Sequence, residues 1–209
     1  MSRFSRIFLL LLCFALSASS LLAQDKLVLF GGYSYLRPPV TVEQIFVCTL
    51  PVCPVQPVGP PALLTSTQNL SGWELSATYR FLPFLGIAAD VSGDYGSAIG
   101  GFSSRTHQHT YLFGPEVSLP ARASPFAHVL FGDTHQSISP SLGPPLPGGQ
   151  FSILATSGSS FATAFGAGID LKLVPHIWIR PIQLDYLVTR LGTTTQNQPR
   201  VSAGVVFHF

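Results

Sequence analysis

Apolar residues alternate with other residues to the very end of this chain. Every second position from 201 to 209 is apolar, and the series ends on the chain-terminal Phe209. A period of two is that of an extended strand, whose side chains point alternately to opposite faces of a sheet. The segment 70–82 alternates as regularly, with Trp73 on one face and Glu74 on the other. The pattern predicts sheets with one apolar face and one face that carries charge.

The same period recurs in eight segments. Each is as long as the roughly 9 to 11 residues that a tilted strand needs to cross a bilayer. The connections between them alternate between short turns and long loops, as in a barrel built from hairpins. The expected strands cover 26–36, 70–82, 84–94, 106–119, 125–135, 160–173, 177–189 and 199–209. We therefore predict an all-β fold, an eight-stranded antiparallel up-and-down transmembrane β-barrel.

The long connections have the composition of loops. They cover 37–69, 95–105, 136–159 and 190–198 and are rich in Pro, Gly, Ser and Thr. Of the 18 prolines, 11 lie in the first and third of these segments. Because proline cannot donate a ladder hydrogen bond, we expect loops without strands there. Both termini then lie with the short turns, on the periplasmic side.

Composition excludes several other classes of protein. Only 10% of the residues are charged, against roughly 25% in an ordinary soluble domain. The only long uninterrupted apolar run lies in the first 23 residues, so spans of about 20 apolar residues cannot follow it. The 11 basic and 9 acidic residues provide no basic face for nucleic acid.

The N-terminus has the pattern of a secretory signal peptide. Two arginines precede an apolar run at 7–16, and small residues follow it. We expect residues 1–23 to be removed and 24–209 to form one outer-membrane β-barrel domain.

Two cysteines remain after that removal. Cys48 and Cys53 lie close together in a Pro-rich segment. In an oxidising compartment such a pair predicts a disulfide-closed loop, the alternative being two free thiols. Only Glu43 lies nearby, too few ligands for a metal site.

The two faces of the predicted strands suit two environments. The face that carries Trp73 has no charged residue and would contact outer-membrane lipid; the alternative is the core of a soluble periplasmic sandwich. The interior of an eight-stranded barrel has room only for side chains, and buried charges require partners. The opposite face therefore predicts a network of ion pairs that plugs the lumen, with a bulge at Arg180-Pro181 that turns both Arg180 and Asp185 inward. Its predicted members are Glu74, Arg80, Asp90, Glu116, Asp170, Lys172, Arg180, Asp185 and Arg200.

Several short motifs resemble one known family. They are the apparent signal peptide, Gly31-Gly32-Tyr33-Ser34-Tyr35, Gly72-Trp73-Glu74, Asp185-Tyr186 and Val205-Val206-Phe207-His208-Phe209. Together they resemble the small eight-stranded outer-membrane barrels of Gram-negative bacteria, the OmpA-type transmembrane domain. The resemblance implies that Phe207 and Phe209 are the signal read by the barrel-assembly machinery. The Pro-rich first loop departs from the family, and the expected absence of a peptidoglycan-binding domain means that cell-wall anchoring is not carried over.

Candidate catalytic and metal-binding residues are few. His135-Gln136-Ser137 resembles the His-x-Ser pair of a lipid A deacylase family, but every Glu lies upstream of it, and a serine nucleophile needs an oriented base. His107 and His109 share a face and could coordinate a metal ion with a third ligand, but we expect them to be rim residues among polar loop atoms. We therefore predict no enzyme, no cofactor and no metal.

The function predicted from these features is structural or interactive. We expect a monomeric outer-membrane barrel whose loops, particularly 37–69 and 136–159, present binding surfaces to an extracellular ligand. The alternatives are a narrow porin-like channel and a lipid A-modifying enzyme.

Overall fold

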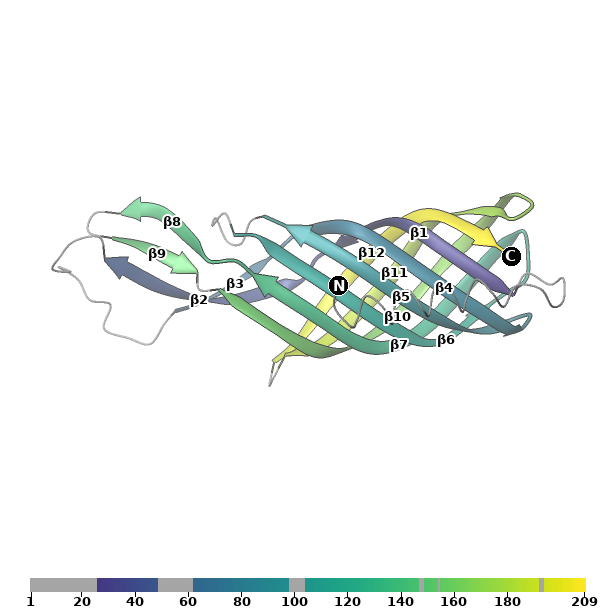
Figure 1. The fold of residues 1–209 in the computed structure, drawn as a ribbon, viewed down its shortest axis with the longest axis horizontal. Helices are drawn as coiled ribbons and strands as arrows, with labels where there is room; N and C mark the ends of the chain where they lie inside the picture. The colour runs from purple at the N-terminus through teal and green to yellow at the C-terminus, as the bar shows by residue number, and fades with distance from the viewer. Residues whose placement is uncertain (1–25, 49–61, 98–103, 147–148, 154, 192–193) are drawn as a thin grey trace, which may run out of the picture.

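Eight strands of the chain close into an antiparallel barrel, in the order β1-β12-β11-β10-β7-β6-β5-β4 (Figure 1). The computed structural model describes residues 26–48, 62–97, 104–146, 149–153, 155–191 and 194–209. The barrel strands are β1 Leu27–Leu36, β4 Leu70–Leu82, β5 Leu85–Gly96, β6 Thr106–Ser118, β7 Ala123–Ile138, β10 Thr156–Val174, β11 Ile177–Leu191 and β12 Thr194–His208. Each overlaps one of the eight predicted segments, so the predicted fold class is confirmed. β7, β10 and β12 extend beyond their predicted segments at the loop side, so most of the predicted loop 190–198 belongs to strands.

Alternation in the sequence becomes alternation of burial. Along β6, buried side chains occupy the even positions and more exposed ones the odd positions. The outer surface is apolar, as shown by Phe113 at 65% and Leu75 at 55% exposed. The charged side chains of the opposite face point into the barrel, where Glu74 and Arg200 are buried. Within the described ranges, no helix is long and apolar enough to cross a membrane.

Four further strands form a second sheet that the sequence did not predict. They are β2 Pro39–Cys48, β3 Ala62–Thr67, β8 Ser141–Leu146 and β9 Gly149–Ile153, in the order β3-β2-β9-β8. The expectation that 37–69 and 136–159 lack strands is therefore wrong. Pro39 begins its strand and Pro145 follows a register shift, so neither occupies the regular interior of a ladder, from which proline is excluded.

The two ends of the barrel differ. One end, called the turn end here, holds the first residue of β1, the C-terminus and the short turns (Figure 1). The second sheet, called the loop-end sheet, projects beyond the opposite, loop end (Figure 1). The predicted signal peptide and Cys53 lie outside the described residues, so the disulfide stays a prediction.

The predicted bulge is present on β11. The register between β11 and β12 shifts between Arg180 and Gln183. A bulge inserts one extra residue into its strand, so the side chains before and after it no longer alternate regularly. Arg180 and Asp185 are therefore both buried, although one has an even and the other an odd number. The bulge therefore places one more cation inside the barrel than strict alternation would.

Candidate functional site in the barrel lumen

Arg200 on β12 lies at the centre of the charges inside the barrel. Its Nε donates a hydrogen bond to Asp185 Oδ2 at 2.9 Å, and its Nη2 lies 2.7 Å from the same oxygen. Its Nη1 donates to Asp90 Oδ1 at 3.1 Å and to Ser92 Oγ at 3.2 Å. Glu74 Oε2 lies 3.5 Å from Nε. One guanidinium therefore joins carboxylates from β4, β5 and β11 and ties distant parts of the chain together.

Gln183 links this centre to a second arginine. Its Nε2 donates to Glu74 Oε1 and to Asp185 Oδ2, both at 2.8 Å. Its Oε1 accepts a hydrogen bond of 2.6 Å from Arg180 Nη1. Ser202 donates to the other oxygen of Glu74. The amide uses both its donor and its acceptor ends, so it can join a carboxylate cluster to a cation.

Arg180 makes the pair nearest the turn end. Its Nε and Nη2 donate to the two carboxylate oxygens of Asp170 at 2.7 and 3.1 Å, a bidentate arrangement. The guanidinium also lies between two rings, 4.4 Å from the centroid of Phe30 and 4.0 Å from that of Phe126. Aromatic faces attract a cation and keep water away from it. The bulge therefore places Arg180 where both its charge and its planar faces have partners.

His128 and Glu116 extend the network on the β6–β7 side. His128 Nε2 lies 3.0 Å from Asp185 Oδ1, and its Nδ1 lies 3.9 Å from Glu116 Oε2. Both side chains are buried. The predicted set did not include His128, although its even position on β7 places it on the same face as the other lumen residues.

Two predicted members lie outside this buried network. Lys172 is exposed, with its Nζ 5.7 Å from the centroid of the Trp178 ring. Arg80 is half-buried and lines a cavity at the turn end. Both lie near the turn-end limits of their strands, where inward-facing side chains reach the mouth of the barrel instead of its sealed interior.

An apolar layer that was not predicted also lies within the lumen. These buried residues share the inward face of their strands with the charged ones: Leu36, Leu70, Ala88, Leu112, Leu130, Ala162, Ala164 and Leu187. Nearer the loop end, Gln108 Nε2 donates to Gln198 Oε1 at 2.8 Å, and Ser34 donates to Asp94 at 2.9 Å. Strand parity alone could have assigned these residues to the interior. The described lumen thus holds paired polar groups and packed leucines.

The candidate catalytic and metal-binding histidines lie on the outside of the barrel. His135 Nδ1 lies 3.0 Å from Ser159 Oγ, so its nearest serine partner is on β10 and is not Ser137. The rings of His107 and His109 contact Tyr95 edge-on, at centroid distances of 5.4 and 5.8 Å. Among the described residues, no group of three or more His, Cys, Asp or Glu side chains is arranged to hold a metal ion.

Comparison with solved structures identifies the fold. The chain is similar to Ail, the attachment invasion locus protein of Yersinia pestis, at 17% identity and a TM-score of 0.50, over 86% of this chain and 98% of that chain. It is also similar to Neisserial surface protein A, at 12% identity and a TM-score of 0.57, over 88% and 97% of the two chains. No protein-family model and no curated protein matches the sequence. The chain therefore has the fold of the small outer-membrane β-barrels, which agrees with the resemblance stated above.

Proposed function

We propose that this protein is a surface-interaction protein of a Gram-negative outer membrane, in which a plugged barrel holds the loop-end sheet toward the cell exterior. A closed barrel supports the membrane location because it satisfies every strand hydrogen bond without an open edge in lipid. The apolar outer surface, with Phe113 and Leu184 more than half exposed, supports the same location. The turn end then faces the periplasm.

The pairing of the two long connections carries the proposed role. β2 pairs with β9 from Gln44–Ile153 to Cys48–Gly149, so segments more than a hundred residues apart in sequence form one sheet. β3 and β8 are its edge strands in the described part of the chain. Unpaired strand edges offer backbone donors and acceptors to an extended segment of another chain. β8 carries two prolines, whereas β3 has none. The β3 edge therefore favours a protein partner for the sheet.

The filled lumen argues against the alternative of a narrow channel. Leu112, Leu130 and Leu187 are at most 4% exposed, and the charges beside them are engaged in ion pairs. In planar bilayers we expect the purified protein to produce no stable single-channel steps. Reproducible conductance from the folded protein would support the channel instead.

Tagging intact cells tests the orientation. An epitope tag inserted between β8 and β9 should bind antibody on intact cells. The same tag inserted in the turn between β6 and β7 should bind only after the outer membrane is opened. The reverse result would contradict the orientation.

Removal of the loop-end sheet tests the interaction role. In the variant, short Gly-Ser turns replace 40–65 and 141–153. It should retain the heat-modifiable migration of a folded barrel, while cells that carry it lose adhesion to protein-coated surfaces that cells with the complete protein bind. Equal adhesion by both kinds of cell on every surface would show that the role is wrong.

A further inference from the structure

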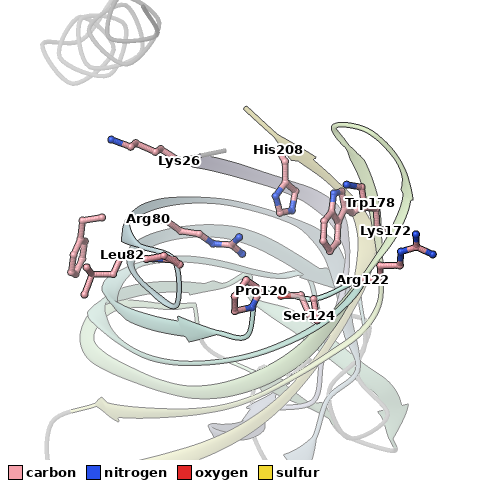
Figure 2. A pocket seen from close by; sticks show the side chains of 12 residues that line it. Lys26, Arg80, Leu82, Pro120, Arg122, Ser124, Lys172, Trp178 and His208 are labelled. Atoms are coloured by element: carbon pink, nitrogen blue, oxygen red, sulfur yellow. The ribbon is translucent and has the colours of Figure 1, made fainter. Parts of the chain in front are cut away.

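A cavity of about 390 Å³ opens at the turn end of the barrel (Figure 2). Its wall includes the inward face of Trp178, which stacks on His208 at a centroid distance of 4.4 Å and an interplanar angle of 15°. Val28, Phe30 and Val206 pack with Trp178 as one buried cluster. The cavity, called the cup here, therefore has an aromatic wall at Trp178, with the buried cluster packed against that residue.

Four cations and no acidic side chain line this cup. Lys26 precedes β1, Arg80 lies on β4, Arg122 lies in the turn between β6 and β7, and Lys172 lies on β10. Deeper in the lumen, by contrast, Arg180 and Arg200 each pair with carboxylates. One terminal carboxylate oxygen of Phe209 is nearby and accepts the backbone N–H of Leu27 at 3.1 Å. Glu116 also interacts electrostatically with Arg80 from the lumen side. The four cations still outnumber these two carboxylates, so the cup keeps a net positive charge.

The backbone brings these cations together in two pairs. The Arg80 N–H donates to the Lys26 carbonyl at 2.7 Å, and the Lys172 N–H donates to the Arg122 carbonyl at 2.9 Å. Like charges on neighbouring strands destabilise a sheet when nothing neutralises them. An anion bound between two such pairs at the rim of one cavity would reduce this repulsion.

Arg80 provides a second, independent indication of a ligand. Its side chain points into the mouth of the cup, whereas the side chains of Lys26 and Arg122 point outward from it (Figure 2). The buried Nε of Arg80 has no hydrogen-bond partner among the described residues. A buried donor without a partner costs free energy that a bound acceptor would recover.

We propose that this cup binds a phosphate group. Guanidinium groups match phosphate oxygens in charge and geometry, and lysines add charge without a fixed direction. The phosphate could be that of a soluble phosphate compound or that of a lipid headgroup, since the exposed Phe81 and Leu82 lie on the rim beside Arg80. The proposal rests on the barrel and its turn end, and is independent of the role of the loop-end sheet.

Trp178 supplies a reporter for the test. The chain contains two tryptophans, so Trp73→Phe leaves Trp178 as the only indole. The folded Trp73→Phe protein in uncharged detergent is titrated with inorganic pyrophosphate, and with monomeric dihexanoyl phosphatidylglycerol against dihexanoyl phosphatidylcholine. Sodium chloride at matched ionic strength is the blank. We expect a saturable change in Trp178 fluorescence with pyrophosphate, with phosphatidylglycerol, or with both.

The pyrophosphate titration and the phospholipid titration distinguish the two sources of phosphate. A response to pyrophosphate alone assigns a soluble ligand, and a response to phosphatidylglycerol beyond that to phosphatidylcholine assigns a headgroup. Arg80→Gln, and separately the exposed pair Arg122→Gln with Lys172→Gln, should weaken the response about tenfold or more, because each removes charge-assisted hydrogen bonds. Arg105→Gln and Arg190→Gln remove exposed cations at the loop end and should leave it unchanged. No saturable response, a response that sodium chloride reproduces, or equal weakening in all four variants would overturn the proposal.

Discussion

His128 and Asp185 lie on strands that are not neighbours in the barrel, yet their side chains meet across the strand between them. Both β7 and β11 pair with β10, and Gly166 of β10 lies in register with both residues. The Nε2–Oδ1 distance is 3.0 Å. A Cβ at Gly166 would lie 1.9 Å from Asp185 Oδ1 and 2.3 Å from His128 Nε2. The missing side chain is what allows the contact.

Gly166→Ala should destabilise the barrel. The added methyl group must push His128 and Asp185 apart inside a packed lumen, and overpacking of this kind costs about 1–3 kcal/mol. The free energy of unfolding in urea, measured on protein folded into detergent or lipid, checks the prediction. Gly31→Ala is the matched control, because its Cβ would meet only the end of the Leu75 side chain, at 3.3 Å. Equal effects of the two substitutions would contradict the steric argument.

Arg200→Leu should lower the free energy of unfolding more than Gly166→Ala does. It leaves Asp90, Asp185 and Glu74 buried without their shared cation, and breaking a buried ion pair on one side costs about 3–5 kcal/mol. Arg190→Leu removes an exposed arginine and should change the unfolding free energy by no more than about 0.5 kcal/mol. Arg200→Lys keeps the charge but loses the forked geometry of the guanidinium. Its loss of unfolding free energy should lie between those of Arg200→Leu and Arg190→Leu. A loss for Arg200→Leu no larger than that for Arg190→Leu would show that the network is not a stabilising one.

Leucines on the two faces should respond differently to truncation. Leu130 is 1% exposed in the lumen, whereas Leu184 is 53% exposed on the outer surface. Leu130→Ala leaves a cavity within fixed neighbours and should cost about 2–5 kcal/mol. Leu184→Ala should cost less, because mobile acyl chains can fill the space. The comparison is made by unfolding both variants from the same lipid, and a larger loss for Leu184→Ala would contradict the assignment of faces.

The two tryptophans test the same assignment through their contact with lipid. Trp73 is 39% exposed on the outer surface and Trp178 is 9% exposed inside. In bilayers with brominated acyl chains, fluorescence of the Trp178→Phe protein should be strongly quenched, since only Trp73 remains. The Trp73→Phe protein should be quenched much less. Stronger quenching of Trp178 than of Trp73 would contradict the assignment of the Trp73 face to lipid.

The terminal phenylalanine is predicted to act in assembly, separately from stability. Phe209 donates its N–H to the Leu27 carbonyl at 2.9 Å, and its side chain is 59% exposed. Phe209→Ala keeps the backbone bond, so refolding in detergent should be unchanged. The amount of folded protein in the outer membrane of cells should fall, because the assembly machinery would no longer recognise the side chain. Phe113→Ala, at a still more exposed aromatic, is the control, and an equal fall there would contradict a specific signal.

The sequence by itself determined the barrel. Period-two alternation assigned eight strands and, except in 125–135 where both faces are apolar, their two faces, because lipid outside and a narrow interior impose opposite requirements on neighbouring residues. The slip at Arg180-Pro181 was enough to predict the bulge. Even the apolar layer around Leu130 could have been assigned from strand parity.

Only the tertiary structure decided which partners the side chains have. The pairing of Arg200 with Asp90 joins residues 110 apart, and no local pattern records which inward side chains face each other across a closed lumen. The β2–β9 pairing was hidden for the same reason, since each strand gains its partner only when the barrel brings two distant loops to one end. The cluster of Arg80, Arg122 and Lys172 also depended on closure, because three separate strand ends become one rim only when the sheet meets itself.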